Sequence, residues 1–291
     1  MRSMGRMERL WDVGVWAILA AVTLIVVIPL WYVLVTSLTP FDVWAHTNGT
    51  LFVAPTKITF DGYRQLLQGG QLLQGFKISV YITVLGTALN LIATTLMAYP
   101  LSRKRFRLRN PILLMVVFTI LFNGGIVPTY IVVRNLHLLD SLWSLMLPNL
   151  INAYNLLVMK AFFQNIPLEV EEAARIDGAS EWQVLWRIML PLSKPILATI
   201  GLFYAVEHWN SFFDAVLYIS DANKDPLQVV LRSILSAGNV SQYADVSSRI
   251  ALPTQALRMA AVVLTIIPML FVYPFLQRYF TSGVLLGSIK E

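Results

Sequence analysis

The sequence predicts an all-α integral membrane protein with six transmembrane helices and with its N- and C-termini in the cytoplasm. Of its 291 residues, 57% are hydrophobic and only 13% are charged, against about 25% charged in ordinary soluble domains. The apolar residues also gather in blocks of about 20, the length that a helix needs to cross roughly 30 Å of hydrocarbon. Six such blocks can be drawn, at 13–35, 78–101, 112–133, 142–163, 196–219 and 259–276.

The first block, 13–35, follows three basic residues, Arg2, Arg6 and Arg9. Its apolar run exceeds the core of about 7 to 15 residues that is typical of a signal peptide, and no cleavage site of small residues follows it. We therefore expect a retained first span rather than a cleaved leader.

The distribution of Lys and Arg predicts the orientation, because basic flanks resist translocation and stay cytoplasmic. With the N-terminus inside, the cytoplasmic segments hold 14 of the 22 basic residues, including a cluster at 103–109, although the outer segments are longer. This bias favours two cytoplasmic termini. It also accounts for the net charge of +6 without a nucleic-acid partner, since the cations lie at membrane flanks.

Cysteine is absent, which excludes disulfides, thiolate nucleophiles and thiolate metal sites. No internal repeat or low-complexity linker stands out, so residues 1–291 are expected to form a single transmembrane domain. Two outer connections, 36–77 and 220–258, are long and carry the Gly, Pro and polar residues that are typical of loops.

An acidic segment, 167–191, lies between the fourth and fifth blocks, on the cytoplasmic side by the predicted orientation. Pro167 suits the first position of a helix, and the glutamates that follow are favourable beside a helix N-terminus. We expect this helix to run to about Ile176.

A turn and a second helix should follow. Gly178 stands where the end of a helix needs a residue that tolerates left-handed dihedral angles. Ser180 with Gln183 matches a capping box that opens a second helix, and Pro191 should close that helix. The segment is therefore predicted to fold as helix, tight turn and helix.

These two helices would present a surface of mixed character. Ala173 and Ala174 leave a small, closely approachable patch beside Glu172, while Trp182 and Trp186 add apolar bulk. Such a surface suits the cleft of a soluble partner, but an amphipathic pair of helices lying on lipid headgroups would carry it too. The residues by themselves favour neither interpretation.

A longer pattern in this segment resembles a known family. EAA at 172–174, three residues, Gly178, nine residues and IMLP at 188–191 is similar at every fixed position to the EAA loop of ABC importer permeases. In that family the loop is a cytoplasmic coupling helix between the fourth and fifth spans, which seats in a cleft of the ATPase subunit and carries its closure to the membrane helices. The resemblance implies that the ATPase-coupling residues are Glu172, Ala173, Ala174, Asp177, Gly178, Ile188, Leu190 and Pro191.

The resemblance extends to sugar permeases of the maltose and multiple-sugar type. The end of the chain reads QRYF-x2-G-x3-G-x2-K at 277–290 and is similar to their terminus, as is WNSF at 209–212. The run FNGGIVPTY at 122–130 is similar to a subfamily that handles larger or acidic glycans, alginate importers among them.

Two positions depart from the family pattern. The family often has Phe shortly before Arg187, where this chain has Leu185 and Trp186. This change replaces one apolar residue with another and should be tolerated. The usual terminal Lys-Gly is here Lys290-Glu291, which leaves open any close contact between the last residue and the ATPases.

Polar side chains within the apolar blocks are costly and usually face a cavity or another helix, so they are the candidates for a transport route. Glu207, Asn210 and Asp214 are spaced i, i+3 and i+7 and would share one face of a helix, with the ring of Trp209 nearby. The alternative is that these groups hydrogen-bond to a neighbouring helix. Together with the polar group after Pro148, the candidate pathway residues are Asn149, Asn152, Tyr154, Asn155, Glu207, Trp209, Asn210 and Asp214.

His208 beside Glu207 does not form the H-E-x-x-H signature, and it has no second histidine or carboxylate at ligand spacing, so no metal site is expected. In the third block, Gly124, Gly125 and Pro128 predict a kink, because Gly and Pro interrupt the hydrogen bonds of a helix.

The leading interpretation is a transport subunit with no catalytic residues. No G-x-x-x-x-G-K-[ST] phosphate loop is present, so ATP and Mg would be bound by partner ATPase subunits. The resemblance implies two ATPase copies, a second homologous permease subunit, an extracytoplasmic solute-binding protein and a carbohydrate substrate. Membrane lipid is expected around the chain, and no nucleic-acid partner is expected. The chain would then work by alternating access in the bacterial cytoplasmic (inner) membrane.

Two alternatives stay open. One is an ABC importer permease for peptides, amino acids or ions, since those permeases share the EAA loop. The other is an intramembrane enzyme that uses Glu207, His208 and Asp214 as acid and base, because buried ionisable groups can be functional.

Overall fold

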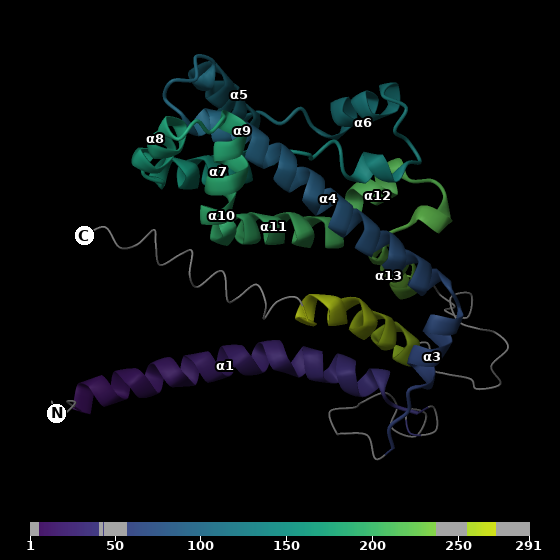
Figure 1. Ribbon diagram of the computed structural model, residues 1–291. Coiled ribbons are helices and arrows are strands. Elements are labelled where there is room, and N and C mark those ends of the chain that lie inside the picture. Colours follow the sequence, from purple (N-terminus) through teal and green to yellow (C-terminus); the bar gives the residue numbers. More distant parts are fainter. Residues whose placement is uncertain (1–5, 41–42, 44–56, 237–254, 272–291) are drawn as a thin grey trace. The chain divides into compact units, whose positions relative to one another are not determined.

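The computed structural model describes residues 6–40, 43, 57–236 and 255–271 (Figure 1). All regular secondary structure in these ranges is helical. The chain divides into two compact units. The first holds the described residues up to Leu72 and from Leu231 to Ile267, and the second holds Leu73–Val230 and the described residues from Pro268 to Phe271. The terminal motif at 277–290 and the Lys290-Glu291 ending lie outside the described residues.

The first unit contains α1 (Arg6–Ser37), which covers the first predicted block. Its apolar side chains are exposed along most of its length, as expected of a helix that faces lipid. At its end, Ser37 Oγ shares a 2.6 Å hydrogen bond with the hydroxyl of Tyr63 in α3 (Asp61–Gln68). The helix Gln255–Phe271 covers the start of the sixth predicted block, and residues 272–276 of that block lie outside the described ranges.

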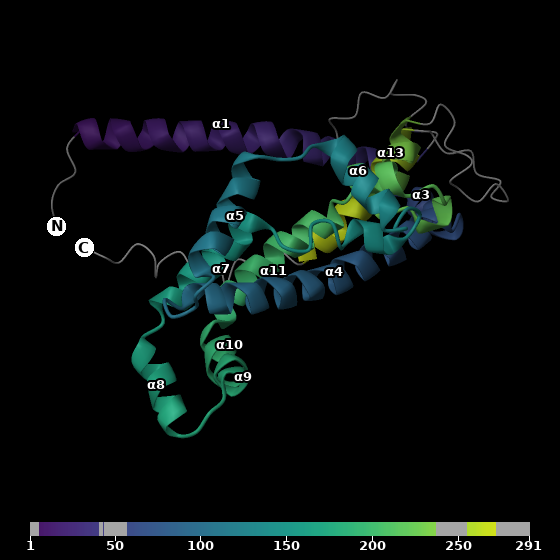
Figure 2. The same cartoon turned by 90° about the horizontal axis from the view of Figure 1, so that it is seen from above.

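The second unit is built around α4 (Gln71–Ser102), which covers the second predicted block. Figure 2 shows α11 (Lys194–Trp209) running beside α4. α7 (Ala153–Asn165) packs against α11 and against α5 (Arg109–Leu121). The core of this unit contains the fully buried side chains Leu156, Met159, Phe163, Ile200 and Tyr204.

The third predicted block, 112–133, is not one continuous helix. α5 ends at Leu121, and α6 (Ile126–Asn135) begins after a non-helical break. Gly125 adopts a φ of +87°, and its N–H donates to the side-chain oxygen of Asn123 at 2.8 Å. A side chain that bonds the local backbone competes with the helical ladder, so the predicted kink is a full interruption.

The fourth block, 142–163, begins with a 3-10 turn, Leu142–Leu145, and regular helix resumes only at α7. The cause is local: Pro148 has no N–H to donate, and Asn152 caps α7 by accepting from the N–H groups of Tyr154 and Asn155.

The fifth block, 196–219, is broken as well. α11 ends at Trp209, and α12 (Phe213–Tyr218) follows after three residues. Asn210 lies at the break, where its side chain donates back to Val206 O at 2.9 Å. The expectation that one helix would carry residues 207–214 on a single face is therefore wrong.

Among the described residues, two helices are long and apolar enough to cross a membrane, Trp11–Ser37 and Gln71–Ser102. A third span results if Glu181–Leu192 and Lys194–Trp209, which meet at a bend of 82°, are counted together. The arrangement of six spans and the cytoplasmic location of both termini stay predictions.

A polar contact joins the segments that follow α6 and α12. The side chain of Asp140 accepts hydrogen bonds from the N–H groups of Ser220 at 3.1 Å and Asp221 at 3.0 Å, and from Lys224 Nζ at 2.9 Å. The hydrogen bond from Lys224, with those from the two amides, lowers the pKa of Asp140 to about 2. The 3-10 turn Ala222–Lys224 and α13 (Leu227–Ser236) follow.

Candidate functional site

The acidic segment folds as the predicted helix, tight turn and helix. α8 (Leu168–Ile176) follows Pro167, which is its N-cap rather than its first residue, and Gly178 has a φ of +84°. The capping box at Ser180 is formed in both directions and opens α9 (Glu181–Val184). Since a cap of this kind stabilises a helix by about 1 kcal/mol, local signals account for this part of the structure.

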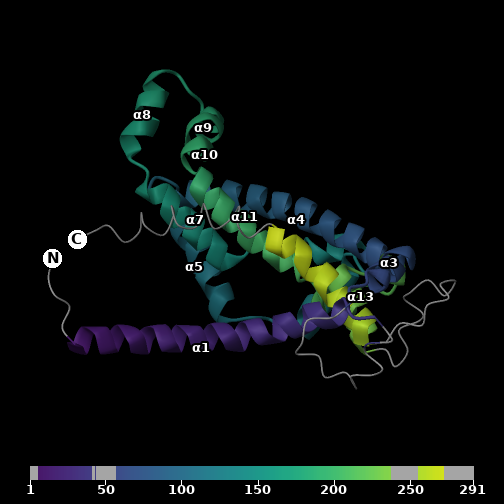
Figure 3. The same ribbon diagram turned by 90° about the horizontal axis from the view of Figure 1, so that it is seen from below.

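The second helix continues beyond α9 through a π-helical turn, Leu185–Met189, and ends with α10 (Leu190–Leu192). Pro191 has no N–H for the carbonyl four residues before it, and the wider turn accommodates this. The helix thus ends at Leu192, one residue beyond the end predicted at Pro191. We call residues 167–192 the helix–turn–helix segment, and Figures 2 and 3 show its α8 and α9 projecting away from α4, α7 and α11.

One face of the helix–turn–helix segment is exposed and partly apolar. The exposed fraction is 86% for Ile176, 62% for Trp182 and 56% for Trp186. Large apolar side chains exposed on one short segment are typical of an interaction surface. Of the predicted coupling residues, those that are exposed are Glu172, Ala173, Asp177, Gly178 and Pro191, whereas Ala174, Ile188 and Leu190 are half-buried.

The other face of the segment packs on the core of the second unit. Val184, Leu185 and Met189 are buried there, with Ala174 and Leu190 packed against the same cluster. Leu185, at a position where the sequence departs from the family pattern, is thus a core residue, and Trp186 lies on the exposed face. Between the two arms, a cavity of about 230 Å³ is lined by Asp177, Gly178, Ala179, Gln183, Arg187 and Ile188.

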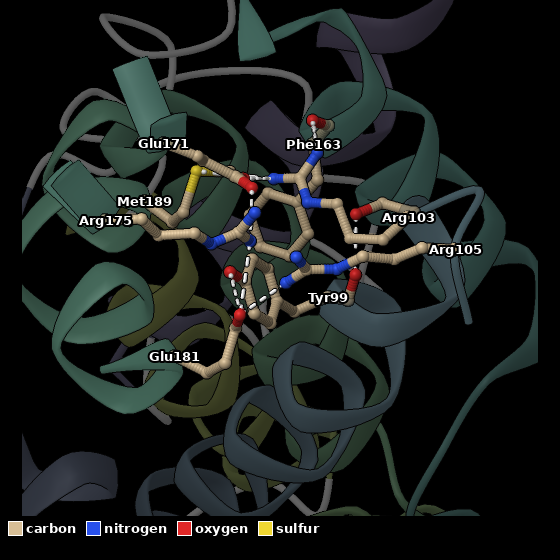
Figure 4. A network of polar contacts seen from close by, with 9 residues as sticks. Tyr99, Arg103, Arg105, Phe163, Glu171, Arg175, Glu181 and Met189 are labelled. Atoms are coloured by element: carbon tan, nitrogen blue, oxygen red, sulfur yellow. Dashed lines mark hydrogen bonds and ion pairs between the residues drawn. The ribbon is translucent and has the colours of Figure 1, made fainter. Parts of the chain in front are cut away.

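A network of charged residues joins the helix–turn–helix segment to the end of α4 (Figure 4). The Glu171 carboxylate, only 2% exposed, pairs with the guanidinium of Arg103, which is 7% exposed and directly follows α4. It also lies 3.4 Å from Arg175 Nη2, one turn further along α8. Glu171 is therefore held by two cations, one of them from another element.

A second glutamate in this network lies on α9. Glu181 pairs with Arg105, lies 3.2 Å from Arg175 Nη2 and accepts a 3.3 Å hydrogen bond from the Tyr99 hydroxyl. Its partial burial acts to raise its pKa, but the hydrogen bond and charge of Arg105, with the charge of Arg175, outweigh burial and lower the pKa. Arg175 bridges the two glutamates and so connects both arms of the segment.

The sequence interpretation missed the buried residues of this network. It assigned ATPase coupling to Glu172, which is exposed, and counted Arg103 only among the basic residues that flank the membrane spans. The spacing of Glu171 and Arg175, one helical turn apart, is the signal that could have predicted one of the ion pairs. No local signal connects Glu171 to Arg103.

The polar residues of the broken fourth and fifth blocks line a cavity of about 190 Å³. Although α11 ends before Asn210, the break brings Glu207, Asn210 and Asp214 to this cavity together with Asn149. Asn149 Nδ2 donates to Asp214 Oδ2 at 3.3 Å. The full lining is Leu145, Asn149, Glu207, His208, Asn210, Ser211, Phe212, Phe213 and Asp214.

The other four candidate pathway residues lie elsewhere. Trp209 is buried, and its ring packs edge to face with Phe76 at 5.9 Å. Asn152 caps α7, Asn155 is buried, and Tyr154 is 64% exposed.

Buried hydrogen bonds behind the cavity fit the alternative interpretation, in which polar groups join helices. Asn90 of α4 donates to the carbonyl of Asn149 at 3.2 Å, and its side-chain oxygen lies 3.4 Å from His208 Nε2. These bonds hold α4 against α11 and against the non-helical segment that lines the cavity. In the described ranges, no group of three His, Cys, Asp or Glu residues could hold a metal ion.

Gly86 of α4 allows the close approach of His208. A Cβ at position 86 would lie 2.5 Å from His208 Nε2, so the ring, which is buried and hydrogen-bonded to Asn90, would have to shift. We expect Gly86→Ala to destabilise the protein by about 1–3 kcal/mol, as overpacking does. The measurement is the thermal unfolding midpoint in detergent, followed by tryptophan fluorescence.

Gly201→Ala is the matched control for Gly86→Ala. It lies on α11, and its new Cβ would meet the end of the flexible Leu91 side chain at 3.2 Å, which can yield. Equal unfolding midpoints for the two variants would contradict the packing role of Gly86.

The chain matches over residues 2–285 the family described as binding-protein-dependent transport system inner membrane component. In Bacillus subtilis (strain 168), it is 42% identical over 285 residues to the polygalacturonan/rhamnogalacturonan transport system permease protein YtcP, covering 97% of this chain and 99% of that one. It is 43% identical over 283 residues to Protein LplC of the same strain, covering 97% of this chain and 95% of that one.

A solved structure is similar as well. It is the crystal structure of a bacterial ABC transporter involved in the import of the acidic polysaccharide alginate, with a TM-score of 0.89 and 31% identity, covering 96% of this chain and 100% of that one. The chain therefore belongs to the family of binding-protein-dependent transport system inner membrane components: it is a permease subunit of a bacterial ABC transporter, located in the inner membrane, and not an enzyme.

Proposed function

We propose that this permease subunit imports a carbohydrate, an oligosaccharide, across the bacterial cytoplasmic membrane by alternating access driven by ATP. The observation that carries the proposal is the exposure of Ile176, Trp182 and Trp186 on the helix–turn–helix segment, which also carries the EAA pattern. The names of the relatives support a carbohydrate, since YtcP is named for polygalacturonan and rhamnogalacturonan and the similar solved structure for alginate.

In this proposal the segment is the cytoplasmic coupling helix. Glu172, Ala173, Asp177 and Gly178 contact a cleft of an ATPase subunit, and the half-buried residues beneath them transmit its movement. Two ATPase copies bind ATP and Mg, a second homologous permease completes the channel, and an extracytoplasmic solute-binding protein delivers the sugar.

The cavity at the broken fifth block is the proposed stretch of the transport route in this subunit. Amide and carboxylate groups from Asn149, Glu207 and Asn210 can bond sugar hydroxyls there. The lining residues carry two carboxylates and no Lys or Arg, which favours a neutral sugar unit over an acidic one at this point. An acidic glycan such as alginate would need its cations from the second permease.

The test is purification of the chain from its native membrane in mild detergent, with mass spectrometry of every protein that accompanies it. Recovery of an ATPase and a second permease is expected, and that complex can then be tested for ATP hydrolysis stimulated by neutral and by uronate-containing oligosaccharides in the presence of the binding protein. Repeated isolation of this chain alone, under conditions that preserve other membrane complexes, would contradict the proposal.

Gly178→Asp is expected to uncouple transport without preventing membrane insertion. Gly178 makes the turn between α8 and α9 with a φ of +84°, and no atom lies within 4 Å of a Cβ built there. The new side chain therefore strains the backbone by about 1–2 kcal/mol and projects from the proposed contact surface. We expect sugar uptake to fall at least about tenfold, equivalent to ~1.4 kcal/mol of coupling.

The chain offers a matched control at Gly70. It has a φ of +81° and the same open surroundings, but lies in the predicted outer connection. Gly70→Asp should impose similar strain and leave uptake unchanged. Wild-type uptake in Gly178→Asp would reject the coupling role of the turn.

A further inference from the structure

The most deeply buried charge of the helix–turn–helix segment is not part of the EAA pattern. Glu171 precedes that pattern by one residue and is 2% exposed, whereas Glu172 faces solvent. A buried ion pair is weak grounds for stability, because apolar residues of similar volume often serve as well. The pairing of Glu171 with Arg103 therefore calls for another explanation.

Arg103 lies where four elements meet (Figure 4). Its guanidinium pairs with Glu171 of α8, donates to the carbonyl of Phe163 at the end of α7 at 3.2 Å, and lies 3.5 Å from the sulfur of Met189 in the π-helical turn. It also lies 5.1 Å from the centre of the Tyr99 ring of α4. The planar fork of an arginine can hold several such partners in one fixed geometry.

These contacts span both arms of the segment. Glu171 is on the first arm and Met189 on the second, while Tyr99 and Phe163 belong to the helices beneath, where their rings pack edge to face at 6.3 Å. A displacement of the segment must move all of these residues together or break the Arg103 contacts.

The neighbouring pair of Arg105 with Glu181 differs in burial. Both side chains are 54% exposed, so water and salt weaken their attraction. Both pairs join the helix–turn–helix segment to the residues just after α4, but only the pair of Arg103 with Glu171 is shielded from water and salt. Arg105 therefore provides a natural comparison within the molecule.

We infer that Arg103 is a positioning residue for coupling: through its buried pair with Glu171 it transmits the movement of the helix–turn–helix segment to α4 and α7. Glu172 is thereby left free for the ATPase, while Glu171 anchors the segment to the membrane helices. The inference rests on the proposed function, in which this segment receives the movement of an ATPase.

The test uses the assembled complex with the variants Glu171→Gln and Arg103→Lys. Glutamine keeps the size and an acceptor oxygen of Glu171 but removes its charge, and lysine keeps the charge of Arg103 but not the fork. We expect both complexes to assemble with basal ATP hydrolysis within about twofold of wild type, while the sugar imported per ATP hydrolysed falls at least about tenfold. Arg105→Gln, the matched control, should leave that ratio within about twofold.

A distance measurement checks the mechanical link directly. Because the chain has no cysteine, spin labels can be placed cleanly at Glu169→Cys on α8 and Lys104→Cys beside Arg103, both at exposed positions. In the otherwise unchanged protein, the distance between the labels should stay the same with and without ATP. In Glu171→Gln it should change or broaden when ATP binds.

Three results would overturn the inference. An unchanged ratio of sugar to ATP in Glu171→Gln would do so, as would a ratio that falls equally in Arg105→Gln. Failure of both variants to assemble would confine the pair to a role in folding. The proposed function fails separately, if the unaltered chain recovers no ATPase.

Discussion

Replacing Ile176 with Asp is expected to weaken the association of the ATPase subunits by about 100-fold, equivalent to ~2.7 kcal/mol. Ile176 is 86% exposed, the largest exposed fraction among the large apolar side chains of the described residues. It lies at the end of α8, next to the turn at Gly178, with Trp182 and Trp186 exposed on the adjoining helix. Burying a carboxylate in an apolar contact without a partner is strongly unfavourable.

The dissociation constant of the ATPases from the permease pair, reconstituted in lipid nanodiscs, measures this effect. Ile58→Asp is the control, because Ile58 is 63% exposed but lies in the predicted outer connection. It should leave the dissociation constant within about twofold, the usual range of surface substitutions. Equal affinities for the Ile176 variant and the unaltered protein would remove the helix–turn–helix segment from the interface with the ATPases.

The helix–turn–helix segment could be predicted from the sequence because its determinants are local. Gly178 supplies a backbone conformation that other residues rarely adopt, and Ser180 and Gln183 cap each other within one helical turn. Each signal acts over a few residues, so neighbouring structure does not override it. The predicted start at Pro167 and the predicted end at Pro191 are each wrong by one residue.

The broken helices could not be predicted from apolar content, because a run of about 20 apolar residues is equally compatible with a straight helix and an interrupted one. The helical spacing of Glu207, Asn210 and Asp214 predicted that they lie together, and they do line one cavity. The predicted reason was wrong, because the interruption of the helix between α11 and α12, and not a shared helix face, brings Asp214 to the cavity.

The link between Glu171 and Arg103 could not be predicted either. The two residues lie far apart in the sequence and meet only because α4, α7 and α8 converge. In the sequence, Arg103 is one of a cluster of basic residues beside a predicted span, and Glu172, not Glu171, belongs to the EAA pattern. The two glutamates differ in burial: Glu171 is buried and Glu172 is exposed. The burial of a single charged residue cannot be predicted from the sequence.

Tyr204→Phe is expected to destabilise the second unit by about 1–3 kcal/mol, because it leaves buried polar groups without a partner. Tyr204 is fully buried on α11, and its hydroxyl lies 2.7 Å from Thr94 Oγ1 of α4 and accepts from the N–H of Asn152 at 3.1 Å. One oxygen thus joins two long helices to the residue that caps α7. The thermal unfolding midpoint of the purified protein measures the loss.

The variant should also affect transport, because the segment that ends at Asn152 contributes Asn149 to the proposed route. Without the tyrosine hydroxyl this segment is held less firmly, so we expect weaker sugar-stimulated ATP hydrolysis even at temperatures where the variant is folded. Tyr154→Phe is the control: its hydroxyl is on the neighbouring helix, the side chain is 64% exposed, and the midpoint should not change. If both variants unfold at the wild-type temperature, the three hydrogen-bonded groups do not stabilise the cavity wall, and the polar groups of α4 and α11 must be assigned to another role.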